Sequence, residues 1–147
     1  MRILGLDYGS KTIGVAVSDP FLITAFGLET IKRPEEGAIK KSLARLGEII
    51  NEYGIETIVL GYPKHLNNTE SERCVKTVAF KSRLTRNFKN VSVILWDERL
   101  TTVSAGKELK SAGIFSKKTT RDIDTVSAVL ILQSYLEYLS KGDIIER

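Results

Sequence analysis

The sequence has a single cysteine and no long apolar stretch. Cys74 has no partner within the chain, which excludes an intramolecular disulfide and makes a reducing compartment the natural setting. No run approaches the ~20 apolar residues of a membrane span, and the chain passes from Met1 into strand-like sequence without a signal-peptide pattern. We therefore expect a soluble cytoplasmic protein without membrane association.

Length and composition limit the number of domains that the chain can form. A chain of 147 residues with 42% hydrophobic content fits one compact domain, residues 1–147, with a core of ordinary size. Lys and Arg together number 22 against 18 acidic residues, a net charge of +4. This balance is compatible with a polyanionic partner but is also common in proteins that have none.

The order of the apolar patterns predicts an α/β fold. Strands are expected at residues 2–7, 12–18, 24–31, 57–62 and 91–96, and helices after Pro34 up to Gly54, at 70–87, at 101–112 and at 120–139. The first three strands would form an antiparallel meander, and the later strands would run parallel to the first beneath covering helices. Active sites in such mixed sheets tend to lie at the carboxyl ends of the parallel strands.

Acidic residues stand where two of these strands end. Asp7 ends the first strand, and Asp97 and Glu98 follow the apolar run at 91–96. Because the carboxyl ends of parallel strands meet at one edge of a sheet, we expect these carboxylates to come together.

Helical phase indicates a third acidic residue. Asp124 lies in line with an apolar stripe within about 100° of arc, made of Ala128, Ile131, Leu132 and Tyr135. Asp122 lies about 160° away, so the phase favours Asp124 without excluding Asp122. The opposite side carries Val126, Val129 and Leu136, so this helix is expected to be covered on both sides or to contact a partner.

Carboxylates gathered at a partly buried edge repel one another and lose hydration. They must take up protons or share a cation, and Mg²⁺ or Mn²⁺ prefers such oxygen ligands. Two ions ~4 Å apart would activate an attacking water and stabilise the leaving oxygen of a phosphodiester. Gly9 leaves room for a substrate backbone beside Asp7. The pattern predicts a metal-dependent nuclease.

Four segments also resemble a known family. LDYGSKTIGVAVSD, VLGYP, WDERLTT and DIDTVSAVLILQSYL are similar to the signature blocks of the YqgF/RuvX family, the Holliday-junction-resolvase-like proteins with a ribonuclease-H-like fold. The resemblance implies a cytoplasmic bacterial nuclease that processes the 5′ end of pre-16S ribosomal RNA. The alternative attribution is resolution of DNA four-way junctions. Carried over by position, the catalytic and metal-binding set is Asp7, Glu98 and Asp124.

The resemblance is not complete around the second block. Gly61-Tyr62-Pro63 stands where Gly-Leu-Pro is common, and KHLNNTE follows where an Asp-Gly turn is usual. Small or basic residues near the expected site are candidate substrate contacts: Gly9, Lys11, Lys64, Arg99, Lys117 and Lys118.

Each candidate also has a simpler explanation. Asp7 could cap its turn, Glu98 could pair with Arg99, and Asp124 could favour its helix dipole. Asp97 is expected to take such a structural role. His65, the only histidine, is expected to be a solvated loop residue rather than a general base.

Two other functional classes remain open at this point. An Asp-x-Gly turn after a first strand also occurs in actin-like ATPases and sugar kinases, but those enzymes clamp the nucleotide between two domains. A nucleic-acid-binding factor without catalysis is the other possibility. Junction resolution needs two active sites, and we expect a monomer or weak homodimer.

Overall fold

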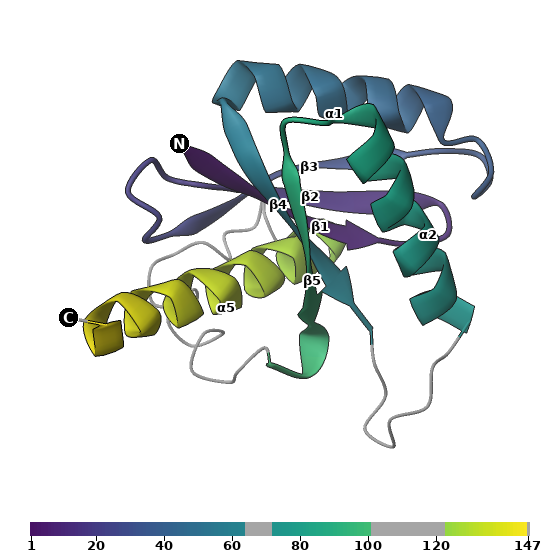
Figure 1. Ribbon diagram of the computed structural model, residues 1–147. Coiled ribbons are helices and arrows are strands. Elements are labelled where there is room, and N and C mark those ends of the chain that lie inside the picture. Colours follow the sequence, from purple (N-terminus) through teal and green to yellow (C-terminus); the bar gives the residue numbers. More distant parts are fainter. Residues whose placement is uncertain (64–71, 101–122, 147) are drawn as a thin grey trace.

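The computed structural model describes residues 1–63, 72–100 and 123–146 (Figure 1). The strands are β1 Arg2–Tyr8, β2 Thr12–Ser18, β3 Ala25–Lys32, β4 Ile55–Tyr62 and β5 Ser92–Asp97. The helices are α1 Lys40–Tyr53, α2 Glu72–Asn87, the short 3₁₀ helix η1 Glu98–Leu100, and α5 Ile123–Glu146. All five predicted strands are present, while the helix predicted at 101–112 and the first residues of the one predicted at 120–139 lie outside the described residues.

The five strands form one mixed sheet in the order β3-β2-β1-β4-β5. Pairing is antiparallel between β1 and β2 and between β2 and β3, and parallel between β1 and β4 and between β4 and β5. The predicted meander followed by parallel strands is therefore confirmed. The carboxyl ends of β1, β4 and β5 point to the same edge of the sheet.

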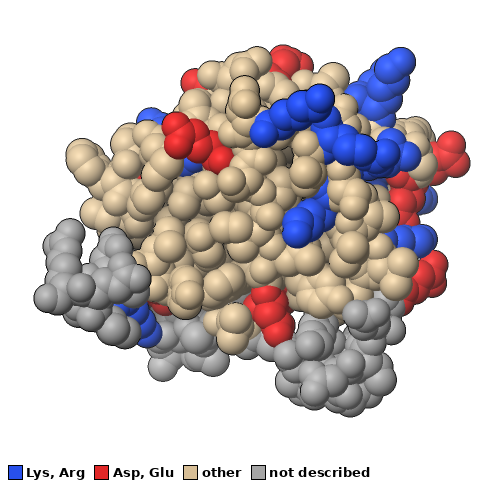
Figure 2. All heavy atoms as spheres, in the orientation of Figure 1, with Lys and Arg blue, Asp and Glu red and all other residues tan. Residues whose placement is uncertain are grey.

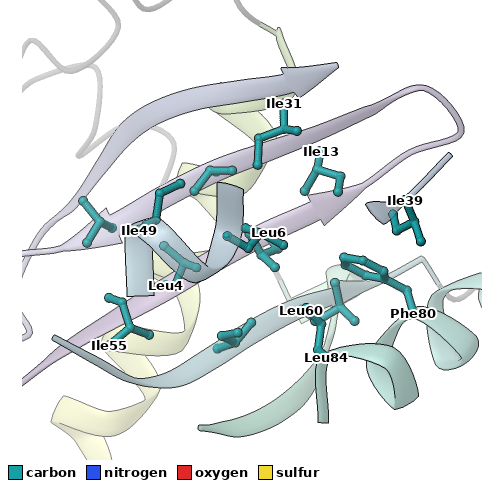
Figure 3. Close-up of a cluster of buried hydrophobic side chains, with 14 residues drawn as sticks. Leu4, Leu6, Ile13, Ile31, Ile39, Ile49, Ile55, Leu60, Phe80 and Leu84 are labelled. Atoms are coloured by element: carbon teal, nitrogen blue, oxygen red, sulfur yellow. The ribbon is translucent and has the colours of Figure 1, made fainter. Parts of the chain in front are cut away.

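The two faces of the sheet carry separate cores because side chains alternate along each strand. Leu4 and Leu6 of β1 pack with residues of α1 and α2, such as Leu46 and Phe80 (Figure 3). Ile3, on the other face, belongs to the cluster that includes the buried residues of α5. Figure 1 shows the same division, with α1 and α2 on one side of the sheet and α5 on the other.

Helix α1 ends where the sequence predicts. Gly54 adopts the left-handed conformation with φ 63°, and its N–H donates to the carbonyl of Ile50. Glycine tolerates this conformation without the steric cost of a Cβ, which is why it stops the helix and returns the chain to β4.

Helix α5 is covered on more than one side, as its distribution of apolar residues predicts. Val129 and Leu136 are as fully buried as Ala128 and Leu132 on the stripe. The helix continues to Glu146, beyond the predicted end at 139, because an established helix propagates at little cost per residue. Within the described part of the chain, no helix combines the length and apolarity that crossing a membrane requires.

Candidate active site

Asp7 lies near the carboxyl end of β1, on the face of the sheet that α5 covers. Alternation along the strand places it with Ile3 and Gly5 rather than with Leu4 and Leu6. Its side chain is half-buried. A carboxylate at this point is partly shielded from solvent.

Glu98 reaches the same edge from β5. It is the first residue after the strand, at the start of η1, and its side chain lies over Gly61 of β4. A Cβ built at Gly61 would come 3.3 Å from the Glu98 carboxyl carbon and 2.5 Å from Cδ1 of Ile131. The absence of a side chain at Gly61 is thus what lets Glu98 lie against the sheet beneath α5.

The environment of Glu98 favours its neutral form. Its pKa is raised to about 7, first by burial, then by the negative charge of Asp7, and then by that of Asp97. Residues 91 positions apart in the chain therefore act on each other electrostatically. The structure brings Asp7 and Glu98 together, with Asp97 contributing to the same negative field.

Close contacts at two glycines fix the position of α5. A Cβ at Gly5 would lie 2.7 Å from Cβ of Leu132, and one at Gly27 would overlap the methyl group of Thr125. A side chain at either position would push the helix away from the sheet, so the helix rests directly on the backbone of β1 and β3.

The first turn of α5 starts beside a row of paired residues that runs across three strands and includes Asp7. The hydroxyls of Thr125 and Thr30 are 3.0 Å apart. Thr30 pairs with Gly14, which pairs with Asp7 on the next strand. The backbone of Asp124 immediately precedes Thr125, but the Asp124 side chain lies outside what the structure describes.

The described side chains therefore supply two of the three predicted acidic groups. No cluster of three or more His, Cys, Asp or Glu side chains suited to a metal occurs among them, a set that does not contain the Asp124 carboxylate. Asp122 lies wholly outside the described residues.

A buried arginine anchors the turn that follows Asp7, and sequence reasoning missed it. Arg33 is 6% exposed, and its Nη2 donates to the carbonyl of Gly9 at 2.6 Å. The backbone N–H of Arg33 donates to the carbonyl of Lys11 at 2.8 Å. Arg33 follows β3 in a polar stretch, and nothing in its local sequence distinguishes it from a solvated arginine.

Tyr8, next to Asp7, is held on the opposite face of the sheet. Its ring stacks on Phe80 with centroids 4.1 Å apart, and the guanidinium groups of Arg33 and Arg73 lie 4.9 and 5.0 Å from the ring centroid. Glu36 accepts hydrogen bonds from Arg73 at 2.8 Å and from Lys76 at 2.9 Å. These bonds, led by the one from Arg73, lower the pKa of Glu36 to about 2. The end of β1 is therefore held in place, on the face of the sheet opposite to Asp7, by a cluster of paired charges and stacked rings.

Only some of the remaining predicted substrate contacts lie among the described residues. Lys11 is exposed in the turn beside Gly9. Gly9 also has a structural reason to be glycine, because a Cβ there would lie 3.1 Å from the carbonyl oxygen of Thr12. Arg99 lies in η1 with its side chain outside the description. Outside the described residues lie Lys64, His65, Lys117 and Lys118.

Basic side chains on the face seen in Figure 2 gather over α2. Lys76 there is engaged with Glu36 and with Glu72, the latter at 3.2 Å. Lys76 is thus engaged in ion pairs within the protein.

Comparison with known proteins decides the family. A family model described as "RuvX: Holliday junction resolvase" matches residues 1–138. The chain belongs to the RuvX family. A relative from Agathobacter rectalis is 53% identical over 142 residues, covering 97% of this chain and 99% of the relative. One from Bacillus subtilis (strain 168) is 49% identical over 141 residues, covering 95% of this chain and 100% of the relative. Both are named "Putative pre-16S rRNA nuclease".

Solved structures share the fold of this RuvX family member. RuvC of T. thermophilus, in complex with a Holliday junction substrate, matches with a TM-score of 0.71 and 21% identity over 97% of each chain. The Holliday junction resolvase of fowlpox virus matches with a TM-score of 0.56 and 17% identity, covering 95% of this chain and 99% of that one. The predicted ribonuclease-H-like fold is thereby confirmed.

The family also confirms the predicted enzyme class. The family description and the names of the relatives both denote nucleases, which are hydrolases of phosphodiester bonds. This favours the predicted nuclease over an actin-like nucleotide-binding module.

Proposed function

We propose that this RuvX family member is a metal-dependent endonuclease whose acidic site consists of Asp7, Glu98 and Asp124, and that it trims the 5′ end of pre-16S ribosomal RNA in the cytoplasm. The observation that carries the proposal is the meeting of Asp7 and Glu98 at one sheet edge, close enough for Asp7 to raise the pKa of Glu98. Two carboxylates forced together in a half-buried place are unfavourable unless something positive joins them.

The donor set fits a hard divalent cation. Asp7, Glu98 and, in the proposal, Asp124 offer only carboxylate oxygens, which suit Mg²⁺ or Mn²⁺ and not a soft metal. When bound, a pair of such ions would activate the attacking water and stabilise charge on the leaving oxygen.

The chain's own residues have separable roles in this mechanism. Asp7 and Glu98 lie close enough for the charge of Asp7 to raise the pKa of Glu98, and Gly61 leaves the space in which the Glu98 carboxyl lies. The buried Arg33 fixes the turn after Asp7 through the Gly9 carbonyl. Asp124 would enter from the first turn of α5, which Thr125 ties to Thr30. Rigid placement of this kind is what lets ligands act without reorganising.

An RNA substrate is favoured by the names of the relatives, which specify pre-16S rRNA at about half identity over nearly the whole chain. We propose Lys11, Arg99, Lys64, Lys117 and Lys118, together with the open backbone at Gly9, as contacts to the substrate phosphates. A monomer or weak homodimer suffices for this reaction.

A second candidate is resolution of branched DNA. It is favoured by the family description and by the RuvC complex with a Holliday junction, which shares the fold of this chain. Cutting two strands in a concerted way needs two active sites and hence a dimer.

The test compares the two substrates directly. Purified protein with Mg²⁺ or Mn²⁺ is incubated with RNA carrying the 5′ end of pre-16S rRNA and with a four-way DNA junction. Asp7→Asn and Asp124→Asn should each lose cleavage while remaining folded, and the exposed Glu56→Gln on β4 is the matched control that keeps it. Full activity in a well-folded Asp124→Asn protein would remove that residue from the site. Cleavage of the junction alone, by a dimer, would reverse the choice of substrate.

A further inference from the structure

A pocket of about 510 Å³ lies between η1 and the second half of α5. The described residues that line it are Trp96, Leu100, Ser134, Glu137, Tyr138 and Lys141. Its volume falls in the range of small-ligand sites. The lining combines aromatic rings with a hydroxyl, a carboxylate and an ammonium group, so it differs from a purely apolar depression.

The aromatic part of the lining is preorganised. The rings of Trp96 and Tyr138 lie 5.3 Å apart, and the Trp96 indole also meets Tyr135 edge-on at 5.2 Å. The indole N–H donates to the Ser134 hydroxyl at 3.2 Å, and that hydroxyl donates to the carbonyl of Leu100 at 2.9 Å. The indole therefore cannot turn without breaking its bond to the same hydroxyl that holds η1 through Leu100.

The outer part of the lining remains open. Tyr138 is 60% exposed and Leu100 is 51% exposed, although both are large apolar or aromatic side chains. An exposed tyrosine ring beside a held indole forms a surface on which a flat group can stack.

The pocket lies near the candidate active site. Leu100 follows Glu98 by two residues within η1. Ile131, which lies over Gly61 together with Glu98, precedes Tyr138 by two turns of α5, a rise of about 10 Å. The pocket is thus within the reach of a nucleotide next to a phosphate held at the carboxylates.

We propose that this pocket binds an unpaired base flanking the scissile phosphate, stacked on the exposed ring of Tyr138 beside Trp96. The inference rests on the proposed nuclease function and adds a single-stranded requirement next to the cut. Stacking on aromatic side chains is the usual way of holding bases outside a duplex, because every base offers a flat face. Lys141 at the rim supplies a positive charge for a neighbouring phosphate, and Glu137 supplies an acceptor for an exocyclic amino group.

Trp96 is the only tryptophan in the chain, so its fluorescence reports on this pocket and its immediate surroundings. The full-length protein, without divalent cations so that no cleavage occurs, is titrated with a short single-stranded oligoadenylate. A parallel titration uses an oligomer of the same length and charge in which every residue is abasic. We expect quenching by the oligoadenylate and at least ten-fold weaker quenching by the abasic oligomer, and ribo and deoxyribo forms of each show whether the sugar matters.

Substitutions locate the base. Tyr138→Ala should weaken binding of the oligoadenylate roughly ten-fold, the order of effect of losing one base–aromatic stack, and Tyr138→Phe should restore it. The matched control is Phe21→Ala, which removes a ring that is 82% exposed in the loop between β2 and β3. Thermal unfolding of each variant shows that the fold is retained.

The outcomes separate this proposal from the proposed function. Equal quenching by the abasic oligomer, or unchanged binding by Tyr138→Ala, overturns the base pocket. So does self-association in sedimentation that Tyr138→Ala abolishes, since a second copy would then be the occupant. If Asp7→Asn still cleaves while quenching stays base-dependent, the acidic site is wrong and the base pocket stands.

Discussion

Glu36 and Glu98 lie on opposite faces of the sheet near the end of β1, and their pKa values differ by about five units. Glu36 faces Arg73 and Lys76, which donate to it, and its pKa falls to about 2. Glu98 is buried near Asp7 and Asp97, and its pKa rises to about 7. The first carboxylate is satisfied by the protein itself, whereas the second is placed where an external cation would relieve it. If the proposed function is right, the contrast separates a structural charge from a metal-binding one.

The strongest test of this contrast compares the cleavage rates of two variants, one at each glutamate. Glu98→Gln should lower the rate of cleavage about a hundred-fold or more, because it removes a ligand oxygen that stabilises transition-state charge. Glu36→Gln should retain most of the rate, measured at a temperature where both variants are folded. Initial rates on the same RNA at saturating Mn²⁺ make the measurement. If both variants lose activity equally, Glu36 is part of the chemistry and the distinction fails.

Stability should show the reverse order. Glu36→Gln removes the charge that Arg73 and Lys76 share, and we expect a loss of about 1–2 kcal/mol in the free energy of unfolding. Urea denaturation at neutral pH measures it, with Glu35→Gln, an exposed neighbour, as the control. A Glu36→Gln protein as stable as the control would mean that the ion pairs contribute nothing.

The smallest effect is a dependence of stability on pH in the absence of divalent cations. Because the folded pKa of Glu98 is raised, the native state holds more protons than the unfolded state between about pH 4.5 and 7. Stability contributed by protonated Glu98 is therefore present at low pH and lost as the pH rises through about 7. Glu98→Gln should become more stable than wild type at about pH 8 and should lose that advantage near pH 4.

Addition of Mn²⁺ sharpens this last comparison. The cation should raise the melting temperature of the wild type more at high than at low pH, because it competes with protons for the same oxygens. The Glu98→Gln protein should respond less. An identical response of the two proteins to Mn²⁺ would show that Glu98 does not hold the cation.

The sequence predicted the acidic edge because the relevant information was local. An apolar run that ends on Asp7 and another that ends on Asp97 and Glu98 are visible as patterns, and parallel strands bring such ends together. The same reasoning predicted the end of α1 at Gly54. Asp124 was favoured by helical phase and by the family resemblance, and its role remains a prediction.

The supporting residues could not be predicted because their roles depend on distant partners. Arg33 matters through the carbonyl of Gly9, and Glu36 matters through Arg73 on α2. Gly61 stood within a predicted buried strand, but its lack of a side chain becomes meaningful only once Glu98 and Ile131 lie over it. None of these contacts has a periodic signature.

Helix α5 packs directly against the backbone at Gly5 and Gly27, and this limits which residues these two positions can accept. A methyl group at either glycine would meet α5 and move the helix that begins beside Asp7, which would also disturb the apolar cluster that α5 forms with the sheet. Displacements of about 1 Å can reduce catalysis a hundred-fold. A substitution at either position would then be expected to reduce stability and activity together, because the same helix closes the core and begins beside the acidic site.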